Sequence, residues 1–348
     1  VGNDGNDNVS VVFAQKGNPN VTWETNTNIN AGVEFGLWND RLTGSVDYFY
    51  RLTSDMLFQV PVLPSLGYTS YWSNIGDMSN TGIEVVLNGD IIRSRNVVWS
   101  VNANLTWVKN KVVRLPESSK DMTVDGHAGF INGSTFIGEG LSLGTLFIHE
   151  YAGVNPETGE SQWHYLDANT GEWTITSDYE NNMNGNLASR KLFGCTQPKV
   201  FGGFGTSFFA YGFDISVAFD YQLGGETLDG SYASYMSSPY SNSLGENYHL
   251  DLLNAWTPGA ELPADVNKQI PRFQFGDEYN AAASTRFITS TNYLNISNIN
   301  VGYTFPAKWW KGNISSLRLY VACDNVWYWS ARKGFDPRGT GTGQYSPI

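Results

Sequence analysis

The sequence predicts an all-β protein, specifically an antiparallel β-barrel that crosses a membrane. Two observations predict this fold: apolar and polar residues alternate over unusually long segments, and short and long connections alternate between those segments. Residues 21–38 alternate over about three times the usual 5–6 residues of a soluble strand. A transmembrane strand needs about 9–11 residues, so the surplus length would project beyond the bilayer.

The segment 21–38 has one apolar and one polar face, because successive side chains of a strand point to opposite sides. Its apolar face carries Trp23, Ile29, Ala31, Val33, Phe35 and Leu37. Its polar face carries Glu24, Asn26, Asn28, Asn30 and Glu34. In a membrane barrel the apolar face meets lipid and the polar face lines the lumen. The same pattern in later strands predicts that the lumen also receives Asp47, Glu84, Asp214 and Asp220.

Two hairpins define the register of neighbouring strands. A two-residue turn at Asn39-Asp40 pairs residues whose numbers sum to 79, so Leu37 faces Leu42. A turn at Tyr211-Gly212 pairs residues whose numbers sum to 423 and also places apolar residues opposite apolar residues. Because both registers keep each face uniform, the pattern predicts paired antiparallel strands.

Further strands are predicted, about ten in total. They cover residues 80–90, 97–110, 286–305 and 314–324, with two less regular strands within 141–166. The short connections are 39–40, about 90–96, 211–212 and about 306–313. The long loops are about 54–79, 112–140, 167–197 and 223–285. Short turns at one rim and long extracellular loops at the other are typical of membrane barrels. Since no change of composition divides the chain, residues 1–348 are assigned to one barrel domain.

The long loops contain clustered aromatic residues that are candidate contacts to a substrate or a protein partner. These residues are Tyr71, Trp72, Tyr232, Tyr235, Tyr240 and Trp256. Aromatic rings in loops can stack on sugar rings or hold peptide side chains, and they can equally well pack against one another. Both interpretations stay open from the sequence.

A secreted β-sandwich that binds glycans is the alternative architecture. A sandwich would bury the apolar face between two sheets, and its strands would be shorter. Its loop lengths would not segregate to one end. The long alternating strands therefore favour the barrel.

Composition excludes several functional classes. The net charge of −12 and the pI near 4.7 argue against nucleic-acid binding, which needs a basic surface. No run of about 18 apolar residues predicts a transmembrane helix, and the first residues do not resemble a signal peptide. The chain is therefore either cytoplasmic or a piece of something longer.

The sequence predicts no enzyme, no metal site and no cofactor. Gly140–Gly144 reads GLSLG and matches the nucleophile elbow of serine hydrolases, but the following residues predict a strand where the elbow needs a helix. A third hypothesis, a barrel enzyme with Ser142 as nucleophile, depends on this motif. The four histidines lack metal-ligand spacing. Two Asn- and Asp-rich stretches, residues 3–8 and 167–172, lack the pattern of an EF-hand.

Several sequence motifs, taken together, resemble those of the SusC/RagA-like, TonB-dependent outer-membrane transporters. They include NPNVTWE at residues 18–24, NDRLTGSVDYFYR at 39–51 and NIGDMSNTGIEVVLNGD at 74–90. Others are PKVFGGFG at 198–205, PRF at 271–273, YLNISNINVGYTFP at 293–306 and LRLYVACDNVWYWSARKGFDP at 317–337. Asn325-Val326 differs from the Asn-Leu pair usual in the family. The resemblance extends over nearly the whole chain in family order.

This resemblance implies a 22-stranded barrel in the outer membrane of a Gram-negative bacterium, with an N-terminal plug. It implies nutrient import energised through TonB, and a SusD-like surface lipoprotein as partner. The chain is expected to be the C-terminal portion of the barrel, without the plug, the TonB-contacting segment, the early strands and the final strand. The imported oligomer would be an oligosaccharide or an oligopeptide, with oligosaccharide slightly preferred.

Overall fold

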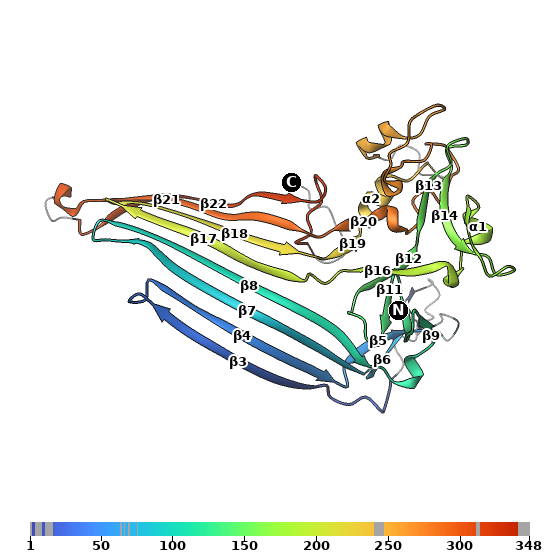
Figure 1. Cartoon of the computed structure of the whole chain (residues 1–348), viewed down its shortest axis with the longest axis horizontal. Coiled ribbons are helices and arrows are strands. Elements are labelled where there is room, and N and C mark those ends of the chain that lie inside the picture. Colours follow the sequence, from blue (N-terminus) through green and yellow to red (C-terminus); the bar gives the residue numbers. More distant parts are fainter. Residues whose placement is uncertain are drawn as a thin grey trace.

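The computed structural model describes residues 2–3, 9–10, 17–62, 65, 67–68, 70–74, 76–239, 247–310 and 314–339. Its main feature is one sheet of eight long antiparallel strands in the order β22-β21-β18-β17-β8-β7-β4-β3 (Figure 1). Each long strand pairs with the next one along the chain, which makes an up-and-down meander. The strands are β3 (Thr25–Leu37), β4 (Leu42–Ser54), β7 (Asp77–Arg93), β8 (Val97–Arg114), β17 (Val200–Ala210), β18 (Phe213–Leu223), β21 (Tyr293–Phe305) and β22 (Leu317–Ser330).

The registers predicted for the two hairpins are confirmed. Leu37 pairs with Leu42 and Val33 with Val46 in the first hairpin. Asn39 and Asp40 have φ of 60° each, the left-handed backbone that a two-residue hairpin turn of type I′ requires. In the second hairpin Ala210 pairs with Phe213.

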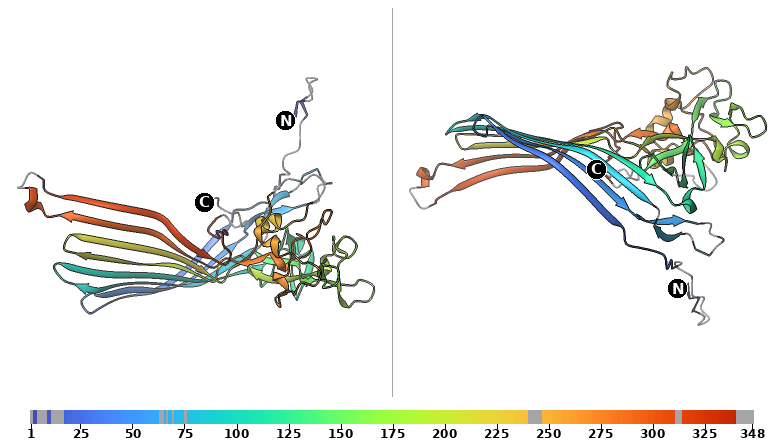
Figure 2. Two further views of the ribbon diagram at one scale, coloured as in Figure 1. Left: turned by 90° about the horizontal axis from the view of Figure 1, so that it is seen from above. Right: turned by 60° about the horizontal axis from the view of Figure 1, so that its bottom comes forward.

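The connections segregate by length as predicted. The turns after β3, β7, β17 and β21 lie together at one end of the sheet, and the larger connections lie at the other end (Figure 1). Figure 2 shows that the sheet between these ends is curved. Segregated connections and a curved meander are both features of a barrel wall.

The long connections are folded and form what we call the loop layer, the described residues within 55–76, 115–199 and 224–292. A five-stranded sheet contains β9 (Met122–Val124), β10 (His127–Asn132), β11 (Thr135–Gly138), β12 (Thr145–His149) and β16 (Arg190–Cys195). A three-stranded sheet contains β13 (Tyr151–Val154), β14 (Ser161–Leu166) and β15 (Trp173–Thr176). Two-stranded sheets pair β5 (Leu57–Pro61) with β6 (Ser70–Asn74) and β19 (Glu226–Leu228) with β20 (Ile288–Ser290), while β1 (Gly2–Asn3) pairs with β2 (Val9–Ser10) outside the loop layer.

The prediction of about ten wall strands was wrong by two, because the described residues contribute eight to the main sheet. Residues 141–166 do form strands, but β12, β13 and β14 belong to the loop layer. All five residues of β12 are buried, so this strand lacks the alternation of a wall strand. A continuous apolar run reads as a strand with both faces covered by protein.

Helical segments are few and short. They are α1 (Tyr179–Asn182) and α2 (Gly230–Tyr235), with single 3₁₀ turns at Glu117–Ser119, Leu187–Ser189, Leu250–Asn254, Val266–Lys268, Thr285–Phe287 and Ala307–Trp310. Within the part of the chain that the structure describes, none of the helices has the length and apolar character needed to span a membrane.

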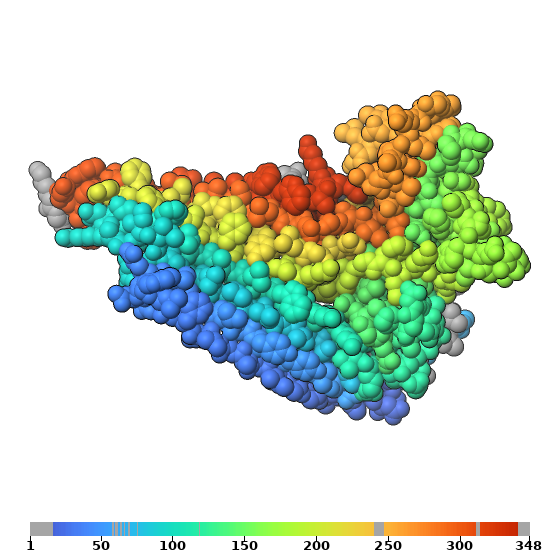
Figure 3. Space-filling view, viewed as in Figure 1, coloured from blue at the N-terminus to red at the C-terminus, as the bar shows by residue number. Residues whose placement is uncertain are grey.

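The apolar side chains of the main sheet are exposed or half-buried, apart from Val112 at the loop end of β8, which is 1% exposed. Val33, Phe213 and Val321 are 68%, 61% and 67% exposed. The buried clusters lie instead at the loop end, for example Tyr151, Val154, Trp163 and Met183. A space-filling view shows the long strands as one continuous wall with the loop layer at its end (Figure 3). A β-sandwich would bury the apolar face, so this alternative architecture does not fit the structure.

Candidate functional site

The polar residues predicted to share one face of the strands do share it. Glu34 pairs with Ser45, which is followed across the sheet by Val86, Asn104, Gly203 and Asp220 in successive pairings. Residues directly opposite each other in paired strands lie on the same face. Glu34 and Asp220 therefore belong to one row of side chains, on a single face of the sheet, that crosses six strands.

A second row contains two of the predicted carboxylates side by side. Asp47 pairs with Gly32 on one side and with Glu84 on the other. On the same face lie Asn26, Asn28 and Asn30 of β3 and Asp214 of β18. Glu24 precedes β3 and is exposed. The structure thus brings the predicted wall residues of the strands to one polar face.

Hydrogen bonds between side chains run across this polar face from strand to strand. Arg51 Nε donates to Asn28 Oδ1 at 2.8 Å, and Thr53 Oγ1 donates to Asn26 Oδ1 at 2.7 Å. Asn295 Nδ2 donates to Asp220 Oδ1 at 2.9 Å. Such bonds satisfy polar groups while leaving further donors and acceptors free to bind water.

The candidate aromatic contacts of the loops divide into exposed and buried residues. Trp72 of β6 and Tyr235 of α2 are 43% and 44% exposed, and Tyr71 is half-buried beside Trp72. Tyr232 is only 9% exposed, and its hydroxyl donates to Asp251 Oδ2 at 2.7 Å. Trp256 is half-buried against the cluster of Tyr151 and Trp163. Tyr240 lies outside the described residues.

For Tyr232 the structure supports packing, which is one of the two interpretations that the sequence left open. Its ring meets Phe287 edge-on at 6.1 Å between ring centroids, and Met236 completes the same buried cluster. The burial of Tyr232 could not be predicted from the sequence, because the residues around an aromatic side chain in a polar loop do not indicate whether it packs inward or faces solvent.

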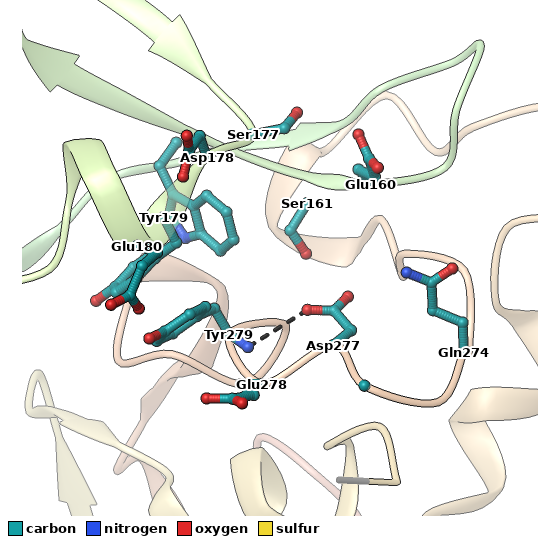
Figure 4. Close-up of a pocket in the computed structure, with 12 residues that line it drawn as sticks. Glu160, Ser161, Ser177, Asp178, Tyr179, Glu180, Gln274, Asp277, Glu278 and Tyr279 are labelled. Carbon is teal, nitrogen blue, oxygen red and sulfur yellow. Dashed lines mark hydrogen bonds between the residues drawn. The ribbon is translucent and has the colours of Figure 1, made fainter.

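A cavity of about 530 Å³ opens in the loop layer, between two segments about a hundred residues apart in the sequence. It is lined by Glu160, Ser161, Trp163, Ser177, Asp178, Tyr179, Glu180, Gln274, Gly276, Asp277, Glu278 and Tyr279 (Figure 4). One wall comes from β14 and the start of α1, and the other from the loop of residues 274–279. Five of these side chains are carboxylates and none is basic.

Two short acidic and aromatic runs meet in this cavity. Asp178-Tyr179-Glu180 and Asp277-Glu278-Tyr279 bring their tyrosine rings together, stacked 4.8 Å apart between centroids with an angle of 18°. Trp163 meets the ring of Tyr179 edge-on at 4.9 Å. The stacked pair thus holds one run against the other, with Asp277 beside Ser161 and with Glu180 and Glu278 at the outer side (Figure 4).

The carboxylates of the cavity differ in their partners. Glu160 accepts from Arg272 at 2.9 Å. Asp277 Oδ1 accepts from the backbone N–H of Asn280 at 3.1 Å, and burial raises the pKa of this carboxyl above its usual value. Glu180 and Glu278 are exposed at the rim. The cavity is therefore a strongly acidic site with a partly desolvated carboxyl inside.

The remaining chemical motifs have structural positions. Residues 140–144 form a turn between β11 and β12, and Ser142 Oγ donates to the backbone oxygen of Asn110 at 2.7 Å. The predicted strand after this turn is confirmed, so the context differs from the strand–turn–helix of a nucleophile elbow. Among the described residues, no three His, Cys, Asp or Glu side chains gather in a way that would hold a metal ion.

Comparison with known proteins identifies the family. Residues 2–189 match the family model described as "TonB dependent receptor-like, beta-barrel". The chain belongs to this family. It is thereby a β-barrel protein of the TonB-dependent receptor type, as the sequence resemblance predicted.

Individual relatives agree with this assignment. The chain is 28% identical to TonB-dependent receptor P3 of Formosa agariphila, over 94% of this chain and 32% of the relative. It is 25% identical to TonB-dependent receptor SusC of Bacteroides thetaiotaomicron, over 92% of this chain and 30% of the relative. The RagAB peptide transporter superposes with a TM-score of 0.79 at 25% identity, covering 99% of this chain and 36% of that chain. The chain thus spans about a third of the length of the relatives that it matches.

The acidic cavity is the feature that sequence reasoning missed. The repeated combination of carboxylates and tyrosine in Asp178–Glu180 and Asp277–Tyr279 was a signal in the sequence. What the sequence could not supply is the meeting of the two runs, because nothing in either run specifies a partner so distant along the chain.

Proposed function

We propose that the chain forms part of the wall and the extracellular face of an outer-membrane transporter that imports oligomeric nutrients, energised through TonB. The observation that carries this proposal is the exposure of the apolar face of the main sheet. The opposite face is polar and contains the row of side chains that runs from Glu34 to Asp220. A sheet of this kind requires an apolar solvent on one side and water on the other. Membership of the TonB-dependent receptor family supports the same reading.

In this proposal the polar face lines the lumen. The residues that would contact passing solute are Glu24, Asn26, Asn28, Asn30, Glu34, Asp47, Glu84, Asp214 and Asp220. Carboxylates and amides along a lumen keep it hydrated and offer hydrogen bonds of modest strength, so a solute can move from one contact to the next. We propose no bond-breaking chemistry for the chain.

A SusD-like lipoprotein is the proposed partner at the extracellular face, and the TonB complex is the proposed source of energy. The loop layer supports the first part, because it has its own buried clusters and presents exposed aromatic residues such as Trp72 and Tyr235. Rigid, aromatic-bearing surfaces are typical of protein interfaces. TonB would act through a part of the protein other than this wall.

The substrate class is open between oligosaccharide and oligopeptide. The sequence slightly favoured oligosaccharide, although the loop aromatics did not decide between the two classes. Of those aromatics, Tyr232 is buried and Trp256 is half-buried. The relatives of known structure include one described as a peptide transporter. This supports oligopeptide for the present chain.

Growth and uptake test the proposal. A strain that lacks the protein is complemented with the complete gene or with a variant carrying Glu34→Ala and Asp220→Ala on the polar face. We expect the deletion to abolish uptake of fluorescent oligomers of one class, and disruption of TonB to do the same. Uptake that continues at the parental rate without the protein, or without TonB, would contradict the proposal.

Membrane fractionation gives an independent check. We expect the complete protein in the outer-membrane fraction, released by detergent and not by high salt. Recovery in a detergent-free soluble fraction would contradict the membrane location.

A further inference from the structure

The acidic cavity of the loop layer has the features of a binding site that the transport proposal does not use. Its volume of about 530 Å³ is within the range of small-molecule sites. It is built between β14, α1 and the loop of residues 274–279, all positioned by the stacked pair Tyr179 and Tyr279. The site is therefore held in place by ring packing, and five carboxylate residues line it.

The charge in this cavity is incompletely balanced by protein groups. Of the five carboxylates that line it, only Glu160 forms an ion pair among the described residues, with Arg272 at 2.9 Å. Asp178 Oδ2 accepts from Asn181 Nδ2 at 2.8 Å, which is a neutral partner. Glu180 and Glu278 stand exposed at the rim. A cation that enters the cavity would meet several carboxylates with no competing positive group on the lining.

One buried polar atom of the cavity wall also lacks a partner. Trp163 is 2% exposed, yet its Nε1 has no hydrogen-bond partner among the described residues. The hydroxyl of Ser161, a residue that is 3% exposed, interacts with the hydroxyl of Tyr151. An indole N–H without a partner needs an acceptor. A ligand that suits this wall has a hydrogen-bond acceptor for the indole N–H and a positive charge for the carboxylates.

The form of the cavity selects among cations. A metal ion would need several oxygens at about 2.3–2.6 Å around one point, whereas this space is large and partly walled by rings. A sugar would need an open ring face to stack on. Here one face of Tyr179 is covered by Tyr279, its ring is met edge-on by Trp163, and Trp163 itself is buried. A slender alkyl chain that ends in an ammonium or guanidinium group fits the remaining space, with carboxylates at its tip and rings along its side.

We infer that this cavity binds the basic side chain of an oligopeptide, with a peptide carbonyl supplying the acceptor for Trp163 Nε1. The inference rests on the proposed import function and specifies its substrate class: peptides that contain arginine or lysine. The rim carboxylates of Glu180 and Glu278 attract the cation, and Asp277 receives it inside. Glycans without amino groups gain nothing from this site.

Binding of defined peptides to the complete protein in detergent tests the inference. The probe is the tripeptide Ala-Arg-Ala, and its neutral counterpart contains citrulline in place of arginine. Isothermal titration calorimetry compares the parent with the variant Glu180→Gln/Glu278→Gln. The control Glu157→Gln/Glu172→Gln removes the same charge from exposed positions of the loop layer that do not line the cavity.

We expect the arginine peptide to bind the parent and the control equally, and the rim variant about fivefold more weakly at physiological salt. The citrulline peptide should bind about as weakly to the parent as to the rim variant. Asp277→Asn is the second variant, since it keeps an oxygen to accept from the backbone of Asn280 while removing the charge. Thermal melts of all variants show whether each is folded.

Three results would overturn the inference: equal affinity for the arginine and citrulline peptides, equal loss in the rim variant and the control, or displacement of the peptide by millimolar calcium together with direct calcium binding. A glucosamine oligomer that binds with the same charge dependence, in the absence of peptide binding, would also overturn it in favour of an amino sugar. Failure of the transport proposal has a different signature, because uptake of every oligomer would then be unaffected by deletion of the protein.

Discussion

Asp214 and Arg318 form an ion pair across a strand that lies between them. Asp214 belongs to β18 and Arg318 to β22, and the guanidinium Nε donates to Asp214 Oδ1 at 3.0 Å above Gly302 of β21. A Cβ built on Gly302 would lie 2.5 Å from the guanidinium and 2.8 Å from the carboxylate. The glycine therefore provides the gap through which two strands that are not neighbours contact each other.

The first prediction follows from this gap. Replacing Gly302 by alanine should push the two side chains apart without straining the backbone, because the clashing atoms are ends of flexible chains. A double-mutant cycle with Asp214→Asn and Arg318→Gln should give a favourable coupling free energy in the parent and none in the Gly302→Ala background. An unchanged coupling energy in that background would show that the glycine is not what permits the ion pair.

The second prediction tests which face of the wall meets lipid. Leu87 lies on the apolar face of β7 and is 38% exposed, while its neighbour Asn88 lies on the polar face. Arginine at position 87 should destabilise the barrel by about 2–4 kcal/mol, because a charge is then placed in the hydrocarbon region. Asn88→Arg, one residue away, should cost less than about 1 kcal/mol, because it faces water.

Urea titration of the complete protein folded into liposomes measures both changes. The two variants are matched in residue type and depth, so their difference reports the solvent on each face. Equal destabilisation by the two substitutions would contradict the assignment of the polar face to the lumen.

The sequence predicted the wall well because the wall obeys a strict period. Leu37 opposite Leu42 and Ala210 opposite Phe213 follow from turn position and alternation alone, and a shift of one residue would exchange the two faces. The polar face could be predicted for the same reason. The pairings that connect Glu34 to Asp220 extend this period through two further strands, β7 and β8.

The loop layer obeys no such period, so its strands and contacts could be predicted less well from the sequence. In β12 the residues Thr145–His149 are all buried, so alternation disappears and the strand was assigned to the wall. Tyr232 and Trp72 occur in similarly polar surroundings in the sequence, but one is buried and the other exposed. The partner of each loop segment is chosen by tertiary packing, as the meeting of Tyr179 with Tyr279 illustrates.

The third prediction concerns a glycine at the boundary between wall and loop layer. Gly76 has φ of 116°, and a Cβ on it would lie 1.8 Å from the backbone oxygen of Arg114. Since the backbone of β8 cannot move aside, Gly76→Ala should destabilise the protein by at least about 3 kcal/mol. The control is Gly126→Ala, where φ is 81° but no atom lies within 4 Å, and the expected cost is about 1–2 kcal/mol. Thermal unfolding followed by circular dichroism ranks the two, and an equal loss would show that φ alone decides.

The fourth prediction concerns an ion pair that joins the segment after β22 to the start of α2. Arg332 Nη1 lies 2.8 Å from Asp229 Oδ2, and its guanidinium lies over the ring of Tyr232 at 3.4 Å from the centroid. The Asp229 side chain is 0% exposed. Arg332→Met should therefore destabilise the protein by about 3 kcal/mol at pH 7, because a buried carboxylate is left without its counter-charge.

The pH dependence of this loss has a definite sign. Burial raises the pKa of Asp229 above its ordinary 3.8, so the folded state binds a proton more tightly than the unfolded state does. Lowering the pH from above the pKa of Asp229 in the folded state toward 3.8 therefore stabilises the folded protein. Removal of Arg332 raises the pKa of Asp229 in the folded state further, so this stabilisation begins at a higher pH. The deficit of Arg332→Met relative to the parent should consequently shrink between pH 7 and pH 4. In the background Asp229→Asn the same substitution should be milder and nearly independent of pH, because no carboxylate remains to titrate. A deficit that stays constant with pH in both backgrounds would mean that Arg332 acts by packing on Tyr232 and not through the charge of Asp229.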